Sequence, residues 1–165
     1  MIPTWLPLSP ADADAVRRLA DQAHPSLPER AAVFADRIHL FPGGCRRLLL
    51  HGELAGYAIA HPWLFEQPPP LDTVFGILPT PADCLHIHDI VVAPALRGHG
   101  LAGEFLDAMA TVASRHRLPR LTLVSVNDTH PLWSRFGFAI REAPALATKL
   151  AGYGSTARYM VRELR

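Results

Sequence analysis

Two histidines and an aspartate lie together in the apolar segment Leu85–Val92. His86 and His88 are two residues apart, so on a strand they face the same side, about 7 Å from each other. An imidazole with a pKa near 6.5 is suited to remove a proton at neutral pH, directly or through water. Asp89 is an orienting or electrostatic partner if a β-bulge turns it to the same face. These three residues are therefore the candidate catalytic groups.

Two other interpretations of these residues remain open. They are structural polar groups with satisfied hydrogen bonds beside the core, or two histidine ligands of a metal ion. The metal interpretation lacks a third ligand in the sequence, so we assign no metal.

A glycine-rich turn follows this segment. Gly98, Gly100 and Gly103 stand where a strand gives way to the start of a helix. Free backbone N–H groups and the positive helix end at such a turn favour phosphate or pyrophosphate. The spacing also matches a dinucleotide fingerprint, with Asp128 placed 25 residues after Gly103. However, residues 94–97 separate the strand from the first glycine, and too little chain remains for a second half of that fold.

The two cysteines give no sign of covalent chemistry. Cys45 and Cys84 are 39 residues apart and form no CxxC pair, so the sequence predicts neither a disulfide framework nor a zinc site. No motif marks either one as a nucleophile. A reducing cytoplasm is the expected location.

The elements that must position these groups follow from breakers and hydrophobic periodicity. Residues 85–126 read as a strand, a glycine turn, a helix and a second strand, which is a parallel crossover. Before it we expect two helices, a hairpin and a proline-rich loop; after it, a short helix and two strands. In chain order the remaining segments are 10–24, 28–42, 46–60, 66–83, 131–136, 138–141 and 157–164.

The length and net charge of the chain exclude several classes of protein. The chain has 165 residues, enough for one domain, 1–165, with a real core. Sixteen Lys and Arg against fifteen Asp and Glu give a net charge of +1, without long runs of one sign. Nothing therefore predicts nucleic-acid binding. No apolar stretch of 18 residues and no signal peptide are present, so we expect no membrane partner.

The glycine turn resembles motif A of the GNAT family, the acetyl-CoA-dependent N-acetyltransferases. The pattern is Arg97-x-x-Gly100-x-Ala102, preceded by Val92-x-Pro94. Residues 132–138, Leu-Trp-Ser-Arg-Phe-Gly-Phe, are similar to motif B of the family. The similarity covers about residues 85 to 140. It implies an α/β fold, the GNAT acyl-CoA N-acyltransferase fold, with a mixed central sheet that is flanked by helices and splays where acetyl-CoA enters.

The resemblance also implies roles for single residues. Several family members carry a base-like Glu where His88 stands, four residues before Val92, which makes His88 the first candidate base. Asn127 resembles a polar family residue that bonds the pantetheine arm, although capping of the following turn explains it equally well. Pantetheine would pair with the backbone of Ile90, Val91 and Val92, and pyrophosphate would lie on the amides of Arg97, Gly98, His99, Gly100, Leu101 and Ala102.

The sequence departs from the family at the general acid. Trp133 stands at the usual tyrosine position, and an indole N–H is no practical proton donor to a thiolate. A packing wall beside the thioester is the expected role of Trp133. Other possible donors are His130, Ser134, Tyr153, Tyr159 and solvent.

The resemblance therefore implies an enzyme that moves an acetyl group from acetyl-CoA directly to a primary amine of a small molecule or peptide. The alternative is a non-catalytic acyl-CoA-binding or sensing module, because the usual tyrosine is missing. A homodimer is possible, since dimers are common in the family.

Overall fold

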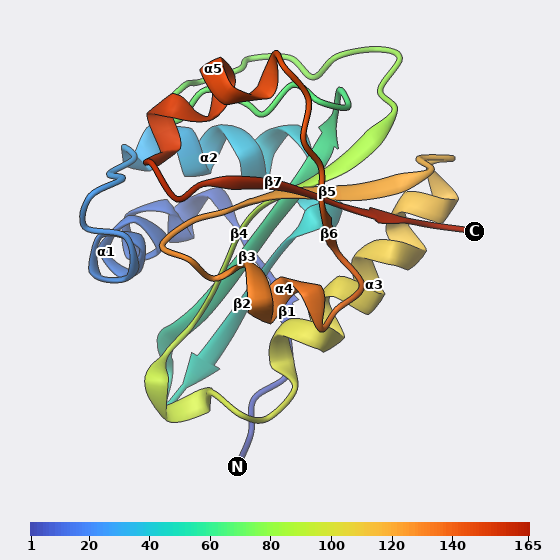
Figure 1. The fold of residues 1–165 in the computed structure, drawn as a ribbon. Helices are drawn as coiled ribbons and strands as arrows, with labels where there is room; N and C mark the ends of the chain where they lie inside the picture. Colours follow the sequence, from blue (N-terminus) through green and yellow to red (C-terminus); the bar gives the residue numbers. More distant parts are fainter.

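A seven-stranded mixed sheet forms the centre of the protein in the computed structural model, which describes residues 1–165 (Figure 1). The strand order is β1-β2-β3-β4-β5-β7-β6. The strands are β1 (Leu6–Pro7), β2 (Cys45–Leu50), β3 (Glu53–Trp63), β4 (Cys84–Val92), β5 (Arg120–Ser125), β6 (Ala139–Ile140) and β7 (Arg158–Glu163). The α-helices are α1 (Ala13–Ala23), α2 (Ala31–Leu40), α3 (Leu101–Arg115), α4 (His130–Ser134) and α5 (Leu146–Leu150).

Helices cover both faces of the sheet and enclose a separate apolar core on each. On one face, α1 and α2 pack on β3 around residues such as Val16, Phe34 and Tyr57. On the other, α3 packs on β4 and β5 around Phe105 and Met109. Each face of the sheet is therefore buried, which accounts for the nearly continuous apolar composition of its central strands.

The crossover from β4 through α3 to β5 is the part of the fold that opens a site. β4 and β5 are parallel, as the sequence predicts, and pair only from Leu85 with Leu121 to Ile87 with Leu123. Beyond this point the two strands separate (Figure 1). The β5-facing edge of residues 88–92 is consequently unpaired, while the opposite edge remains bonded to β3.

The predicted elements are present with small shifts at their ends. Ser9 and Asp12 form a capping box, and a 3₁₀ turn, Pro10–Asp12, precedes α1. The second helix begins at Ala31 and not at Pro28, so Glu29 lies just before it. Strand β1 and helix α5 were not predicted. No helix is both long and apolar enough to cross a membrane.

Candidate active site

A β-bulge in β4 sets the direction of the candidate catalytic side chains. Ile59 of β3 pairs with Asp89, and the next residue, Ala60, pairs with Ile87, so His88 is the extra residue. The bulge breaks the alternation of side chains. Asp89 lies on the same face as Tyr57, to which it bonds, and His88 contacts Phe34 of α2 on that face. A β-bulge therefore turns Asp89 to the same face as His88, as the candidate role of Asp89 required.

His88 is paired with a carboxylate that the sequence did not indicate. Its Nε2 atom lies 2.7 Å from Oε1 of Glu29, and the two side chains are only 4% and 8% exposed. Burial alone would raise the pKa of Glu29, but the bond and charge of His88, the Asp72 amide and Arg37 hold that pKa at about 2. Nδ1 of His88 has no protein partner and is not among the enclosed polar atoms. This nitrogen is free to meet a substrate.

Asp89 does not bond to His88 but to two other side chains. The Tyr57 hydroxyl donates to Oδ2 at 2.6 Å, and Nε2 of His24 lies 3.0 Å from Oδ1. Burial and the charge of Asp89 raise the pKa of Tyr57 well above its usual value, so it remains a donor. The bond to Asp89 raises the pKa of His24, against the effect of burial. Both oxygens of Asp89 are thus occupied.

His86 is separated from this group. It is buried, and its Nδ1 lies 3.0 Å from Oγ1 of Thr122 on β5. Burial, helped by the neighbouring His61, holds the pKa of His86 well below 6.5, so it stays neutral. It does not reach the groove described next, and its contacts are those of a structural histidine.

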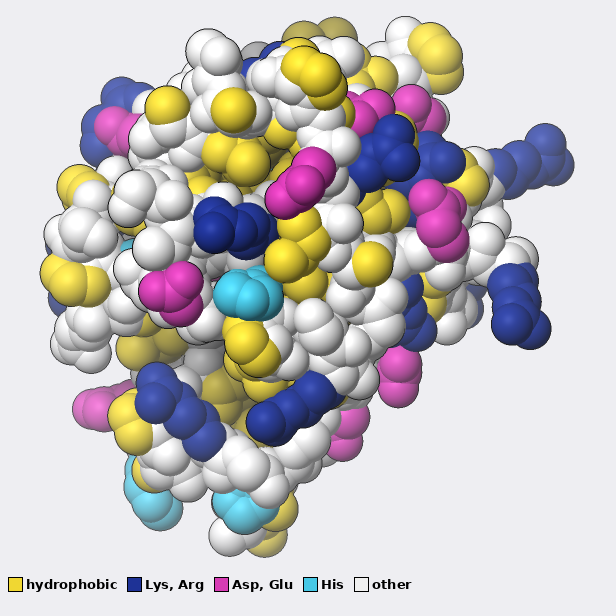
Figure 2. All heavy atoms as spheres, in the orientation of Figure 1, with side chains coloured by type: hydrophobic (Ala, Val, Ile, Leu, Met, Phe, Trp, Pro, Cys, Tyr) yellow, Lys and Arg dark blue, Asp and Glu magenta, His cyan; other side chains and the backbone are white.

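A groove of about 680 Å³ lies where β4 and β5 separate. Figure 2 shows this face hollowed below its centre, with apolar side chains inside and Lys or Arg side chains at the edge. Of the predicted site residues, only His86 and His99 do not line it. The predicted residues that do are His88, Asp89, Ile90, Val91, Val92, Arg97, Gly98, Gly100, Leu101, Ala102, Asn127 and Trp133.

The turn before α3 presents backbone donors to this groove. Gly98 and Gly100 have φ angles of 81° and 75°, a conformation that favours glycine. The N–H groups of residues 98–100 have no acceptor in the protein, and no side chain caps α3. The first N–H groups of the helix are free by its geometry. Together with Arg97 and Arg135, which also line the groove, these donors suit a pyrophosphate.

The opposite wall of the groove contains no obvious proton donor. The Trp133 indole donates to Oγ1 of Thr129 at 3.3 Å, and its ring packs against the α3 core, as expected of a wall. The Asn127 side chain is exposed and makes no hydrogen bond, so it does not cap the turn. None of the other candidate donors lines the groove; these are His130, Ser134, Tyr153 and Tyr159.

The cysteines are both buried and free. Burial raises the pKa of each thiol to about 12, and neither lines the groove. A thiol of this kind is protonated near neutral pH and is a poor nucleophile. No group of three or more His, Cys, Asp or Glu side chains is arranged to hold a metal ion.

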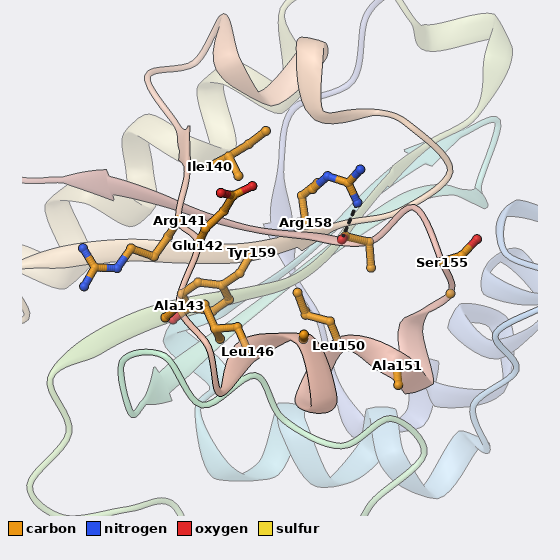
Figure 3. Close-up of a pocket in the computed structure, with 13 residues that line it drawn as sticks. Ile140, Arg141, Glu142, Ala143, Leu146, Leu150, Ala151, Ser155, Arg158 and Tyr159 are labelled. Atoms are coloured by element: carbon orange, nitrogen blue, oxygen red, sulfur yellow. Dashed lines mark hydrogen bonds between the residues drawn. The ribbon is translucent and has the colours of Figure 1, made fainter.

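A second hollow, of about 450 Å³, lies inside the segment 140–159 (Figure 3). The end of β6, helix α5 and the start of β7 enclose it, with Leu146, Leu150 and Tyr159 among its apolar walls. Tyr159 pairs with Val124 of β5, which lines the groove. None of the predicted site residues lines this hollow.

Sequence reasoning missed four polar residues of the site. His24 and Glu29 lie in the connection between α1 and α2, Tyr57 lies on β3, and Arg135 lies two residues after Trp133. Arg135 lies within the segment that resembles motif B, so its position in the sequence could have indicated it. His24 and Glu29 are 65 and 59 residues from their partners in β4, and no local pattern marks such a pairing.

The sheet order, the parallel crossover and the groove define the GNAT acyl-CoA acyltransferase fold. The sequence model of the acetyltransferase (GNAT) family matches residues 13–138, and the chain belongs to this family. An uncharacterised N-acetyltransferase of Schizosaccharomyces pombe (strain 972) is 36% identical over 50 residues. The match covers 30% of this chain and 21% of that protein, so the matched part spans about a fifth of this relative's length.

Solved structures share the fold at low sequence identity, and two of them serve as examples. The GNAT-like decarboxylase GphF in complex with isobutyryl-CoA has a TM-score of 0.75 and 18% identity, covering 98% of this chain and 99% of that one. Naa50 of Arabidopsis thaliana, in complex with the bisubstrate analogue CoA-Ac-MVNAL, has a TM-score of 0.71 and 11% identity, covering 99% and 100%.

Proposed function

We propose that the protein is an N-acetyltransferase that moves an acetyl group from acetyl-CoA directly to a primary amine of a small molecule or peptide. The observation that carries the proposal is the convergence on one groove of an unpaired strand edge, a row of free helix-start amides and a histidine with a free ring nitrogen. The buried, free cysteines accord with a cytoplasmic location, which forms part of the proposal.

The groove fits acetyl-CoA part by part. The free edge of residues 90–92 offers main-chain hydrogen bonds to the extended pantetheine arm. The amides of the turn and the guanidinium groups of Arg97 and Arg135 meet the pyrophosphate. In this proposal the thioester lies near the bulge of β4, beside His88.

His88 is the proposed general base. Its Nδ1 atom takes a proton from the acceptor amine, directly or through one water, as the nitrogen bonds to the acetyl carbonyl carbon. The carbon–sulfur bond then breaks, and the departing thiolate takes a proton from solvent, because none of the candidate donors His130, Ser134, Tyr153 and Tyr159 lines the groove. The two cysteines are buried and protonated, which supports transfer without an acyl-enzyme.

The similar proteins support acyl-CoA chemistry and leave the acceptor open. One relative is named an N-acetyltransferase, and the Naa50 complex contains the bisubstrate analogue CoA-Ac-MVNAL. A peptide amine is therefore one acceptor to test. GphF is called a decarboxylase, so the same fold also serves a reaction without an amine.

A second candidate function is a non-catalytic acyl-CoA-binding module. It is favoured by one observation: Trp133 faces the groove where the family has a tyrosine, and its N–H is engaged by Thr129. Such a module protects bound acetyl-CoA and does not consume it.

Release of CoA thiol from acetyl-CoA tests the proposal, measured across small amines, aminoglycosides, polyamines and peptides with free N-termini. We expect thiol release that depends on one class of amine and an acceptor heavier by one acetyl group. Saturable binding of acetyl-CoA with no amine-dependent release across the panel would favour the binding module.

A further inference from the structure

Glu29 makes two bonds that link the candidate base to a distant loop. Its Oε1 atom lies 2.7 Å from Nε2 of His88, and its Oε2 atom accepts the backbone N–H of Asp72 at 2.9 Å. One carboxylate oxygen of Glu29 therefore bonds to His88, and the other bonds to the loop. Glu29 occupies the short connection before α2, at the boundary between the sheet and the proline-rich loop.

The loop that contains Asp72 is fastened to α2 at two points. At the first, Asp72 accepts from the backbone N–H and the guanidinium of Arg30. At the second, Asp36 accepts from the amides of Phe75 and Gly76, at 2.9 and 3.0 Å. The loop segment 72–76 is thus held by loop amides that donate to Glu29 and Asp36 and by the Asp72 carboxylate, which accepts from Arg30.

We propose that Glu29 is a positioning residue that fixes His88 with its Nδ1 free for the acceptor amine and ties this state to the docked loop. The inference depends on the proposed function for its catalytic role, and it adds to that proposal a residue that positions the base. The bond geometry carries it: an ionised carboxylate can only accept, so Nε2 of His88 must carry the hydrogen, and the lone pair of the neutral ring is left on Nδ1.

The same contact stabilises the charged form of the base. When Nδ1 takes a proton from the amine, Glu29 faces the new imidazolium at hydrogen-bond distance and remains ionised. The proton is then released to solvent and the pair is restored. The titratable and charged groups around the pair are Arg37 of α2, Tyr57 and His61 of β3, His86 and Asp89 of β4, His24 after α1, Asp72 of the loop and Tyr153 before β7.

Loop docking and the base are coupled through this carboxylate. The Asp72 amide is one of the groups that keep the pKa of Glu29 low. If the loop leaves α2, Glu29 loses that donor and gains freedom to turn away from His88. A docked loop therefore favours the orientation needed for proton removal.

The test is NMR of the His88 ring nitrogens in the full chain, for wild type, Glu29→Gln and Asp72→Ala, which identifies the nitrogen that carries the proton. We expect wild type to carry its neutral-ring proton on Nε2. In Glu29→Gln the ring should be a mixture of the two tautomers, because the amide of Gln can donate as well as accept. Asp72→Ala loses the bonds to Arg30 that help to hold the loop, so it should change the tautomer in the same direction but less.

Kinetics supply the second readout. With a reactive amine, Glu29→Gln should lower kcat by roughly tenfold or more, which is a smaller effect than the 10² to 10⁴ expected for loss of the base itself. The KM for acetyl-CoA should stay within about twofold of the wild-type value, because Glu29 does not line the groove. Glu29→Asp, which retains the charge, should return kcat and the tautomer of His88 toward wild type.

Three results would overturn the inference: a wild-type ring protonated on Nδ1, the wild-type tautomer in folded Glu29→Gln, or unchanged kcat in that variant. The tautomer is read in wild type, so the test holds even if a variant does not fold. If no amine reacts at all, the proposed function fails, and the tautomer still decides whether Glu29 orients His88.

Discussion

At the scale of single residues, the two histidine–carboxylate pairs near the bulge are not equivalent. His88 keeps a ring nitrogen without a protein hydrogen-bond partner and outside the fully buried atoms, while Glu29 bonds to the other nitrogen. His24 also bonds to a carboxylate, but its Nδ1 is buried without a partner. This difference supports His88 as the proposed base, whereas the pair of His24 and Asp89 has no ring nitrogen open to the groove.

His88→Ala should lower kcat by about 10² to 10⁴ because it removes the general base. The KM for acetyl-CoA should change little, since the helix-start amides remain. Steady-state kinetics at pH 7 provide the measurement. His39→Ala is the matched control, because His39 is exposed on α2 and lies outside the groove. Full turnover in His88→Ala would remove His88 from the mechanism.

At the scale of elements, the site depends on where β4 stops pairing with β5. Pairing ends at Ile87, one residue before the bulge, so the strand edge and the bulged His88 open into the same groove. The glycine turn then brings the start of α3 to the other end of this edge. Strand, turn and helix together line one groove of about 680 Å³.

Gly100→Val should raise the Kd for acetyl-CoA by about tenfold or more, which is about 1.4 kcal/mol. A branched side chain strains the φ of 75° and projects where a pyrophosphate would lie. Gly52→Val is the control, because Gly52 has a φ of 79°, open space around it and a place in the β2–β3 turn. Calorimetry that gives the two folded variants equal affinity would contradict the assigned cofactor site.

The contact between α2 and the proline-rich loop should be costly to break. Asp36 bonds to Arg37, which is fully buried, and to two loop amides. Asp36→Ala should reduce the free energy of unfolding by about 3 to 5 kcal/mol, because it leaves a buried charge unpaired. Asp21→Ala, which breaks the exposed Arg17–Asp21 pair, should cost about 0.5 kcal/mol or less. Similar losses in urea melts of the two variants would disprove this role of Asp36.

Local patterns accounted for the elements better than for the site. The crossover and the hairpin were predictable, because hydrophobic periodicity and glycine turns are properties of neighbouring residues. Strand β1 has two residues, one of them Pro7, and α5 has five, so neither carries a periodic signal. The groove followed from the glycine turn, whereas the carboxylate of Glu29 reaches His88 only through the tertiary fold.

At the scale of the whole molecule, burying several histidines on one face of the sheet makes stability depend on pH. His61 and His86 are adjacent and fully enclosed, with ring centroids 5.6 Å apart. Burial lowers the pKa of His61 to about 3 and that of His86 well below 6.5. The unfolded chain therefore binds more protons than the folded protein below about pH 6.5.

The free energy of unfolding should fall as the pH drops from about 6.5 toward 3, by up to about 1.4 kcal/mol per pH unit for each histidine. Glu29 adds to the loss between about pH 5 and 2, because its folded pKa of about 2 lies below the usual 4.5. Urea melts between pH 4 and 8 test this. His61→Phe should flatten the curve and His39→Ala should not; a flat wild-type curve would contradict neutral buried histidines.

A crystal structure with bound acetyl-CoA tests the central claim most directly. We expect the pyrophosphate on the amides of residues 98–102, the pantetheine arm along Ile90–Val92, and the thioester next to Nδ1 of His88. A cofactor seated elsewhere, for example in the hollow within residues 140–159, or a thioester remote from His88, would contradict both the site and the proposed base.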